Sequence, residues 1–199
     1  MFRQLRRVEG QAERGFEGTV AEGAERRRRL RLELLRQHLA QNVDFLKAAH
    51  LGGASGQQSV QAYASFMDGF LSTLFRLAVE DAKKEGAVPS PIVLVALGGY
   101  GRGELGPLSD LDLMVIYDGE MGPYVRRATQ GLLYTLWDLG LTVGHSVRSL
   151  PDCVAMARTD FASRTSMQEA RYVVGDRRLF QRFRKVLAEN VYRKDFGQF

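Results

Sequence analysis

Residues 94–117 read LVALGGYGRGELGPLSDLDLMVIY, and this stretch decides the fold. An apolar run leads into a glycine-dense turn, and a second apolar run then opens with Asp110 and Asp112. Because side chains alternate between the two faces of a strand, both carboxylates point the same way while Leu111 and Leu113 point into the core. The stretch therefore predicts two strands joined by a glycine turn, with a pair of acids at the start of the second strand.

The paired carboxylates indicate a site for a divalent metal. Mg²⁺ prefers hard oxygen ligands and is usually held by one or two carboxylates, with water and substrate phosphate completing its shell. Upstream, Gly98 and Gly99 let backbone N–H groups approach a phosphate without a side chain in the way. The alternative is that the two aspartates cap a turn. Like charges on one face repel, however, and usually need a cation between them, so the pattern favours phosphoryl or nucleotidyl transfer.

The order of these residues resembles the signature of the DNA polymerase β-type nucleotidyltransferase superfamily, in which a glycine pair precedes SDLDL at the next strand. The fuller run GGYGRGEL…SDLDL, with VGHSVR at 143–148 and EAR at 169–171, resembles the N-terminal catalytic region of bacterial protein-PII uridylyltransferases. The likeness covers roughly residues 60–185. It implies an α+β fold, namely a small mixed β-sheet of the polymerase β-like type flanked by N-terminal and C-terminal helices.

The resemblance also implies an activity and a set of site residues. The activity is transfer of UMP from UTP, or from another NTP, to a tyrosine hydroxyl of the PII nitrogen-regulatory protein in the cytoplasm, with release of pyrophosphate. Asp110 and Asp112 would be the catalytic ligands of Mg²⁺. The nucleotide-binding residues would be Gly98, Gly99, Arg102 and Ser109. Two of these have a structural alternative, because Arg102 could pair with Glu104 and Ser109 could cap the turn.

The expected third strand, Leu141 to Val147, carries no acid, although many enzymes of this fold place a third carboxylate there as general base. His145 could take the proton instead, or it could be structural. Arg148, Glu169 and Arg171 match family positions, and we expect them to form salt bridges that tie helix to sheet. Two other functions stay open: a non-catalytic nucleotide-binding regulatory module, or an adenylyltransferase of the type that modifies glutamine synthetase.

Composition excludes several other classes of protein. The single cysteine, Cys153, rules out a disulfide within the chain and suits a reducing cytoplasm. No apolar run reaches the roughly 18–20 residues that span a bilayer, so no membrane association is expected. The net charge of +5 could suggest nucleic acid, but basic and acidic residues are interleaved, which makes that partner unlikely. Residues 101–106 match the dinucleotide pattern GxGxxG, but Pro107 follows at once where a long helix would be needed.

Helical and strand periodicity divide the 199 residues into three segments. Residues 1–58 form an N-terminal helical lead-in with a helix from Glu22 to Ala49. Residues 59–150 form the nucleotidyltransferase core, and 151–199 a C-terminal helical segment that we expect to be truncated relative to full-length family members. The core is predicted to hold helices at 59–84 and 123–139 and strands at 92–97, 112–117 and 141–147. The last segment is predicted to hold helices at 151–158, 161–174 and 176–192.

Overall fold

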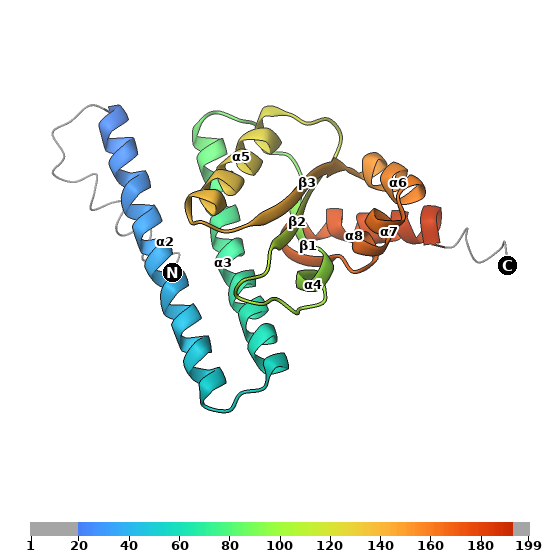
Figure 1. Cartoon of the computed structure of the whole chain (residues 1–199). Helices are drawn as coiled ribbons and strands as arrows, with labels where there is room; N and C mark the ends of the chain where they lie inside the picture. Colours follow the sequence, from blue (N-terminus) through green and yellow to red (C-terminus); the bar gives the residue numbers. More distant parts are fainter. Residues whose placement is uncertain (1–19, 193–199) are drawn as a thin grey trace.

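The computed structural model describes residues 20–192, and it shows a four-stranded mixed sheet between helices (Figure 1). The predicted lead-in before residue 20 and the end of the chain after residue 192 lie outside the described residues. The elements are α2 (Val20–Leu51), α3 (Gly56–Lys84), β1 (Ile92–Ala96), α4 (Gly98–Gly101), β2 (Leu111–Tyr117), α5 (Pro123–Asp138), β3 (Val143–Ser149), α6 (Leu150–Thr159), α7 (Phe161–Gln168), β4 (Arg171–Gly175), α8 (Arg177–Leu187) and the π-helical turn η1 (Ala188–Tyr192). The predicted α+β fold is confirmed.

The sheet has the strand order β3-β2-β1-β4. Strand β1 runs antiparallel to both of its neighbours, whereas β2 and β3 run parallel, so the sheet is mixed. In the parallel pair, Asp112 lies opposite Gly144 and Ile116 lies opposite Arg148. Among the described strands, β3 and β4 form the two edges of the sheet.

Each face of the sheet is covered by its own group of helices, which gives three layers (Figure 1). Leu113 and Val115 of β2 belong to the core that contains the buried residues of α3 and α5. Met114 and Ile116 of the same strand belong to the second core, with residues of α6 and α8. Because side chains alternate, Asp112 lies on the same face as Met114 and Ile116, at the open end of the second layer.

The two long N-terminal helices form an antiparallel pair beside the sheet (Figure 1). Ser55 caps α3, and a capping box with Gln58 starts this helix at Gly56, three residues before the predicted start. Helix α3 buries an apolar face, with Met67 and Phe70 at 0% and 1% exposure. In the described part of the chain, no helix has the length and apolar content needed to cross a membrane.

One predicted helix is wrong in its second half. The sequence pattern predicts a helix over residues 161–174, but α7 ends at Gln168 and residues 171–175 form β4. The β-branched pair at 173–174 favours a strand, and β1 offers a free edge with which this segment pairs. Tertiary pairing therefore overrides the helical periodicity, and the sheet gains a fourth strand that the sequence did not predict. The neighbouring prediction of a helix over 176–192 is confirmed as α8 followed by η1.

Candidate active site

The acids stand at the N-terminal end of β2, and the structure brings them together. Asp110 directly precedes the strand and Asp112 is its second residue, while Leu111 and Leu113 between and beyond them are each 2% exposed. Although Asp112 is an exposed residue, its carboxyl lies between Gly98 of α4 and Gly144 of β3. This partial burial, and after it the negative charge of Asp110, raises the pKa of Asp112. Neither carboxylate has a hydrogen-bond or ion-pair partner among the described residues.

Glycines flank the Asp112 carboxyl on both sides. A Cβ atom added to Gly98 would lie 3.0 Å from Oδ2 of Asp112, and one added to Gly144 would lie 2.5 Å from Oδ1. Gly98 also has a φ of +53°, which side chains rarely adopt. The first residue of α4 and the residue beside Asp112 on β3 must therefore both lack a side chain to leave this carboxylate in place.

The glycine turn that precedes the acids is a single helical turn, α4. The N–H of Leu97 donates to the Asp112 carbonyl at 2.9 Å, which ties the start of this turn to the acid strand. As in any first turn, the N–H groups of Gly98, Gly99 and Tyr100 have no intrahelical acceptor, and none is found among the other described residues. These donors lie beside the acids and are available to an anion.

A charged cluster behind α4 fixes the turn in position. Arg171 of β4 donates to both carboxylate oxygens of Asp68, at 2.6 and 3.1 Å, and to the carbonyls of Tyr100 and Gly101 at 3.0 and 3.2 Å. The Tyr100 hydroxyl donates to Asp68 at 2.6 Å, and burial raises the pKa of this tyrosine. The salt-bridge role predicted for Arg171 is confirmed. Its partners on α3 and α4 were not singled out by the sequence, because no local pattern links residues so far apart.

The remaining predicted residues lie near the turn. Arg102 is half exposed and pairs with Glu169 at 2.8 Å and with Glu104 at 3.4 Å, so the structural alternative for Arg102 is present in the structure. Ser109 is exposed in the loop before Asp110, where its N–H donates to the Gly106 carbonyl at 3.0 Å. A nucleotide-binding role for either residue stays a prediction.

The register of β3 shows on which face of the sheet His145 lies. In the parallel register this residue lies opposite Leu113, and its ring contacts Trp137 of α5 with centroids 5.6 Å apart. His145 therefore projects to the face opposite Asp112, which favours the structural alternative for this residue over a role as general base. The residue beside Asp112 is Gly144, which sequence reasoning missed because the register of two distant strands is not encoded locally.

The donor set suits a hard cation that brings other ligands with it. Among residues 20–192, no three or more His, Cys, Asp or Glu side chains are grouped to hold a metal ion. Two unpartnered carboxylates beside free N–H donors nevertheless match the way Mg²⁺ binds, with few protein ligands and the rest from water and phosphate. The residues present fit a Mg²⁺–phosphate complex better than a protein-enclosed metal.

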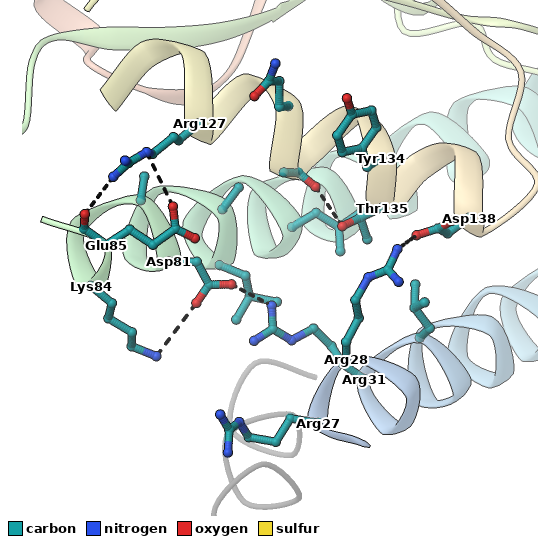
Figure 2. Close-up of a pocket in the computed structure, with 17 residues that line it drawn as sticks. Arg27, Arg28, Arg31, Asp81, Lys84, Glu85, Arg127, Tyr134, Thr135 and Asp138 are labelled. Atoms are coloured by element: carbon teal, nitrogen blue, oxygen red, sulfur yellow. Dashed lines mark hydrogen bonds and ion pairs between the residues drawn. The ribbon is translucent and has the colours of Figure 1, made fainter. Parts of the chain in front are cut away.

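A hollow lies away from the acids, between α2, α3 and α5. It measures about 730 Å³, and Arg28, Arg31, Lys84 and Arg127 at its wall pair with acids (Figure 2). Arg28 bridges to Asp138 at 2.6 Å and Arg31 to Asp81 at 2.8 Å. These two arginines of α2 therefore tie this helix to α5 and α3.

The fold and the acid pair beside a glycine turn define a nucleotidyltransferase domain. The family model of the DUF294 nucleotidyltransferases matches residues 40–145, so the chain belongs to this family. Over 136 residues, 66% of this chain and 14% of the relative, it is 41% identical to the bifunctional uridylyltransferase/uridylyl-removing enzyme of Azospirillum brasilense. Over 183 residues, 91% of this chain and 19% of the relative, it is 32% identical to the protein of the same name from Caulobacter vibrioides. The chain thus spans less than a fifth of these relatives.

Among solved structures, the chain is similar to one described as "Crystal structure of the toxin-antitoxin with AMP-PNP". The TM-score is 0.36 and the identity 12%, with 61% of this chain and 88% of the other covered. At this level of similarity, the fold assignment rests on the elements of the chain itself.

Proposed function

We propose that this chain carries a Mg²⁺-dependent site that transfers UMP from UTP to a tyrosine hydroxyl of a PII-type nitrogen-regulatory protein in the cytoplasm, with release of pyrophosphate. The observation that carries the proposal is the unpartnered pair Asp110 and Asp112, with the Asp112 carboxyl set between Gly98 and Gly144. The names of the relatives support uridylyl transfer. The acceptor is the one implied by the sequence resemblance.

Different residues of the chain would hold the metal ion and bind the phosphates of the substrate. Asp110 and Asp112 would hold Mg²⁺, which when bound offsets the negative charge of the triphosphate and of the departing pyrophosphate. The free N–H groups at the start of α4 would bind phosphate oxygens, and the Asp68–Arg171 pair keeps that turn in place behind them. Ser109, next to Asp110, would add a hydroxyl at the phosphates.

The acceptor must approach without help from an acid on β3. A tyrosine hydroxyl has an ordinary pKa near 10, well below that of an aliphatic alcohol, so it loses its proton with less assistance. Attack of this oxygen on the α-phosphorus forms the new P–O bond, breaks the bond to pyrophosphate and releases the phenolic proton to water. A phenolic acceptor is thus consistent with a β3 strand that presents Gly144 where many related enzymes have a carboxylate.

The test measures transfer of label from UTP or ATP to a PII-type protein in the presence of Mg²⁺. Asp110→Asn should lower the rate by about 10² or more, the size of losses seen when one charge-stabilising group is removed. Asp44→Asn, an exposed change on α2, is the matched control and should leave the rate unchanged.

Three results would contradict the proposal. Binding of UTP without transfer would indicate the regulatory module, and a preference for ATP would indicate an adenylyltransferase. Equal rates for Asp110→Asn and Asp44→Asn would show that the acid pair is not the site.

A further inference from the structure

Strand β3 is an open edge directly beside the candidate active site. In the described part of the chain, β2 is the sole strand that pairs with β3, and Gly144 and His145 are both exposed. The seven-residue pairing with β2 has no register shift. Natural proteins usually protect such edges with bulges, prolines or charged side chains; β3 has no bulge and no proline, and Arg148, near its end, is its single Lys, Arg, Asp or Glu residue. It therefore presents a regular row of backbone groups to a further strand.

The outward groups of β3 can be assigned from its pairing. The Leu111 N–H donates to the Thr142 carbonyl at 2.9 Å. In a parallel ladder, alternate residues of a strand bond to the partner, so the even-numbered residues of β3 face β2. The N–H and C=O groups of Val143, His145 and Val147 consequently point away from the sheet.

The surroundings of Asp112 differ between the β1 side and the β3 side. On the β1 side, Gly98 and the N–H donors of α4 suit the phosphates of a nucleotide. On the β3 side, Gly144 leaves an open path to Asp112, with no side chain in between. A strand added to β3 would lie two strand spacings, about 10 Å, from β2, a distance that a long side chain crossing Gly144 largely spans. A tyrosine on such a strand can thus direct its hydroxyl toward the acids.

Exposed aromatic side chains stand next to this edge. Trp137 is 43% exposed and Tyr134 55% exposed, and their rings lie 5.7 Å apart on α5. Trp137 also contacts His145 of β3, so the aromatic surface continues onto the edge strand. Exposed tryptophan and tyrosine are the side chains most often found at the energetic centre of protein interfaces.

We propose that the acceptor protein binds as an extended segment that pairs with the outer edge of β3, rests on Trp137 and carries its hydroxyl across Gly144 to Asp112. This inference rests on the proposed function, since it names how the acceptor of that site is held. Main-chain hydrogen bonds to the edge provide affinity in this mode, and flanking side chains provide specificity.

The experiment measures both the binding of a PII-type protein in the presence of a non-hydrolysable UTP analogue and the kinetics of UMP transfer. Trp137→Ala should raise the KM and the Kd for the PII-type protein about tenfold or more, the loss typical of a truncated interface aromatic. The KM for UTP should stay unchanged. Phe45→Ala removes an aromatic ring of α2 that is even more exposed, at 71% against 43% for Trp137, and should change neither constant.

His145→Pro tests the backbone pairing. Proline removes one N–H that points outward from β3 and leaves the ladder to β2 intact, so the Kd for the PII-type protein should rise while the thermal midpoint stays close to that of the unmodified chain. If this variant does not fold, Trp137→Ala alone decides, because its side chain is at the surface.

Other outcomes would separate the inference from the proposed function or overturn one or both. An unchanged Kd in Trp137→Ala would show that the acceptor binds elsewhere, and this result would leave the proposed function standing if transfer still occurs. A raised KM for UTP would make Trp137 part of the nucleotide site, and a changed oligomeric state would make the edge a contact between copies of the chain. Edge binding without transfer would support the inference and contradict the proposed function, whereas neither binding nor transfer would contradict both.

Discussion

Replacing Gly144 by alanine should disable the site while leaving the fold intact. The added Cβ would lie 2.5 Å from Oδ1 of Asp112, whereas ordinary van der Waals contact begins at 3.4 Å. The carboxylate must therefore move by about 0.9 Å. Because the atom that has to move is the end of a side chain at the surface, the cost in stability is small. A misplacement of about 1 Å in an active site can nevertheless cost 10²-fold in rate, and we expect a loss of that order in kcat for Gly144→Ala.

The assay combines labelled UMP transfer to a PII-type protein with thermal unfolding. Gly69→Ala is the matched control, because a Cβ on this exposed glycine of α3 meets nothing within 4 Å. It should keep the full rate and raise the stability by up to about 1 kcal/mol, since alanine favours a helix interior. A Gly144→Ala variant that keeps its rate within a few-fold would refute the reasoning, and so would one that unfolds, because either result would place the strain elsewhere than on Asp112.

Three further predictions concern the acids and their support. Asp112→Asn should abolish transfer yet raise the thermal midpoint at neutral pH. Because the pKa of Asp112 is raised in the folded chain, ionisation of this carboxyl opposes folding above that pKa, and the gain in midpoint should vanish as the pH falls below the ordinary value near 3.8. A lower midpoint for Asp112→Asn at pH 7 would contradict this prediction. Chelation of Mg²⁺ should stop transfer, and added Mg²⁺ should raise the midpoint of the unmodified chain but not that of Asp110→Asn, a difference that calorimetry can measure. Arg171→Ala should lower the free energy of urea unfolding by roughly 1–3 kcal/mol, because it leaves the Asp68 carboxylate without its two-point partner; an unchanged value would show that the α4 turn is held in another way.

Strand β4 shows where the sequence pattern misled. The sequence pattern predicted a helix as far as residue 174, because a short segment with both apolar and polar residues can fit the helical periodicity as well as the strand periodicity. The segment is a strand because β1 has a free edge that it satisfies, and this edge exists only once the sheet has formed. The buried strands β1 and β2, by contrast, were predicted to within about one residue at each end, because their apolar runs and the glycines that bound them are local signals.

The candidate site also combines features that the sequence predicts with features that only the tertiary structure shows. From the sequence alone it followed that two acids share one face of a strand and that a glycine turn precedes them, because alternation along a strand and the backbone freedom of glycine are properties of neighbouring residues. Only the tertiary structure decided that Gly144 rather than His145 lies beside Asp112. It also showed that Arg171 holds the turn through Asp68, a residue 103 positions away. Strand register and packing arise from contacts between distant segments, and no local pattern encodes them.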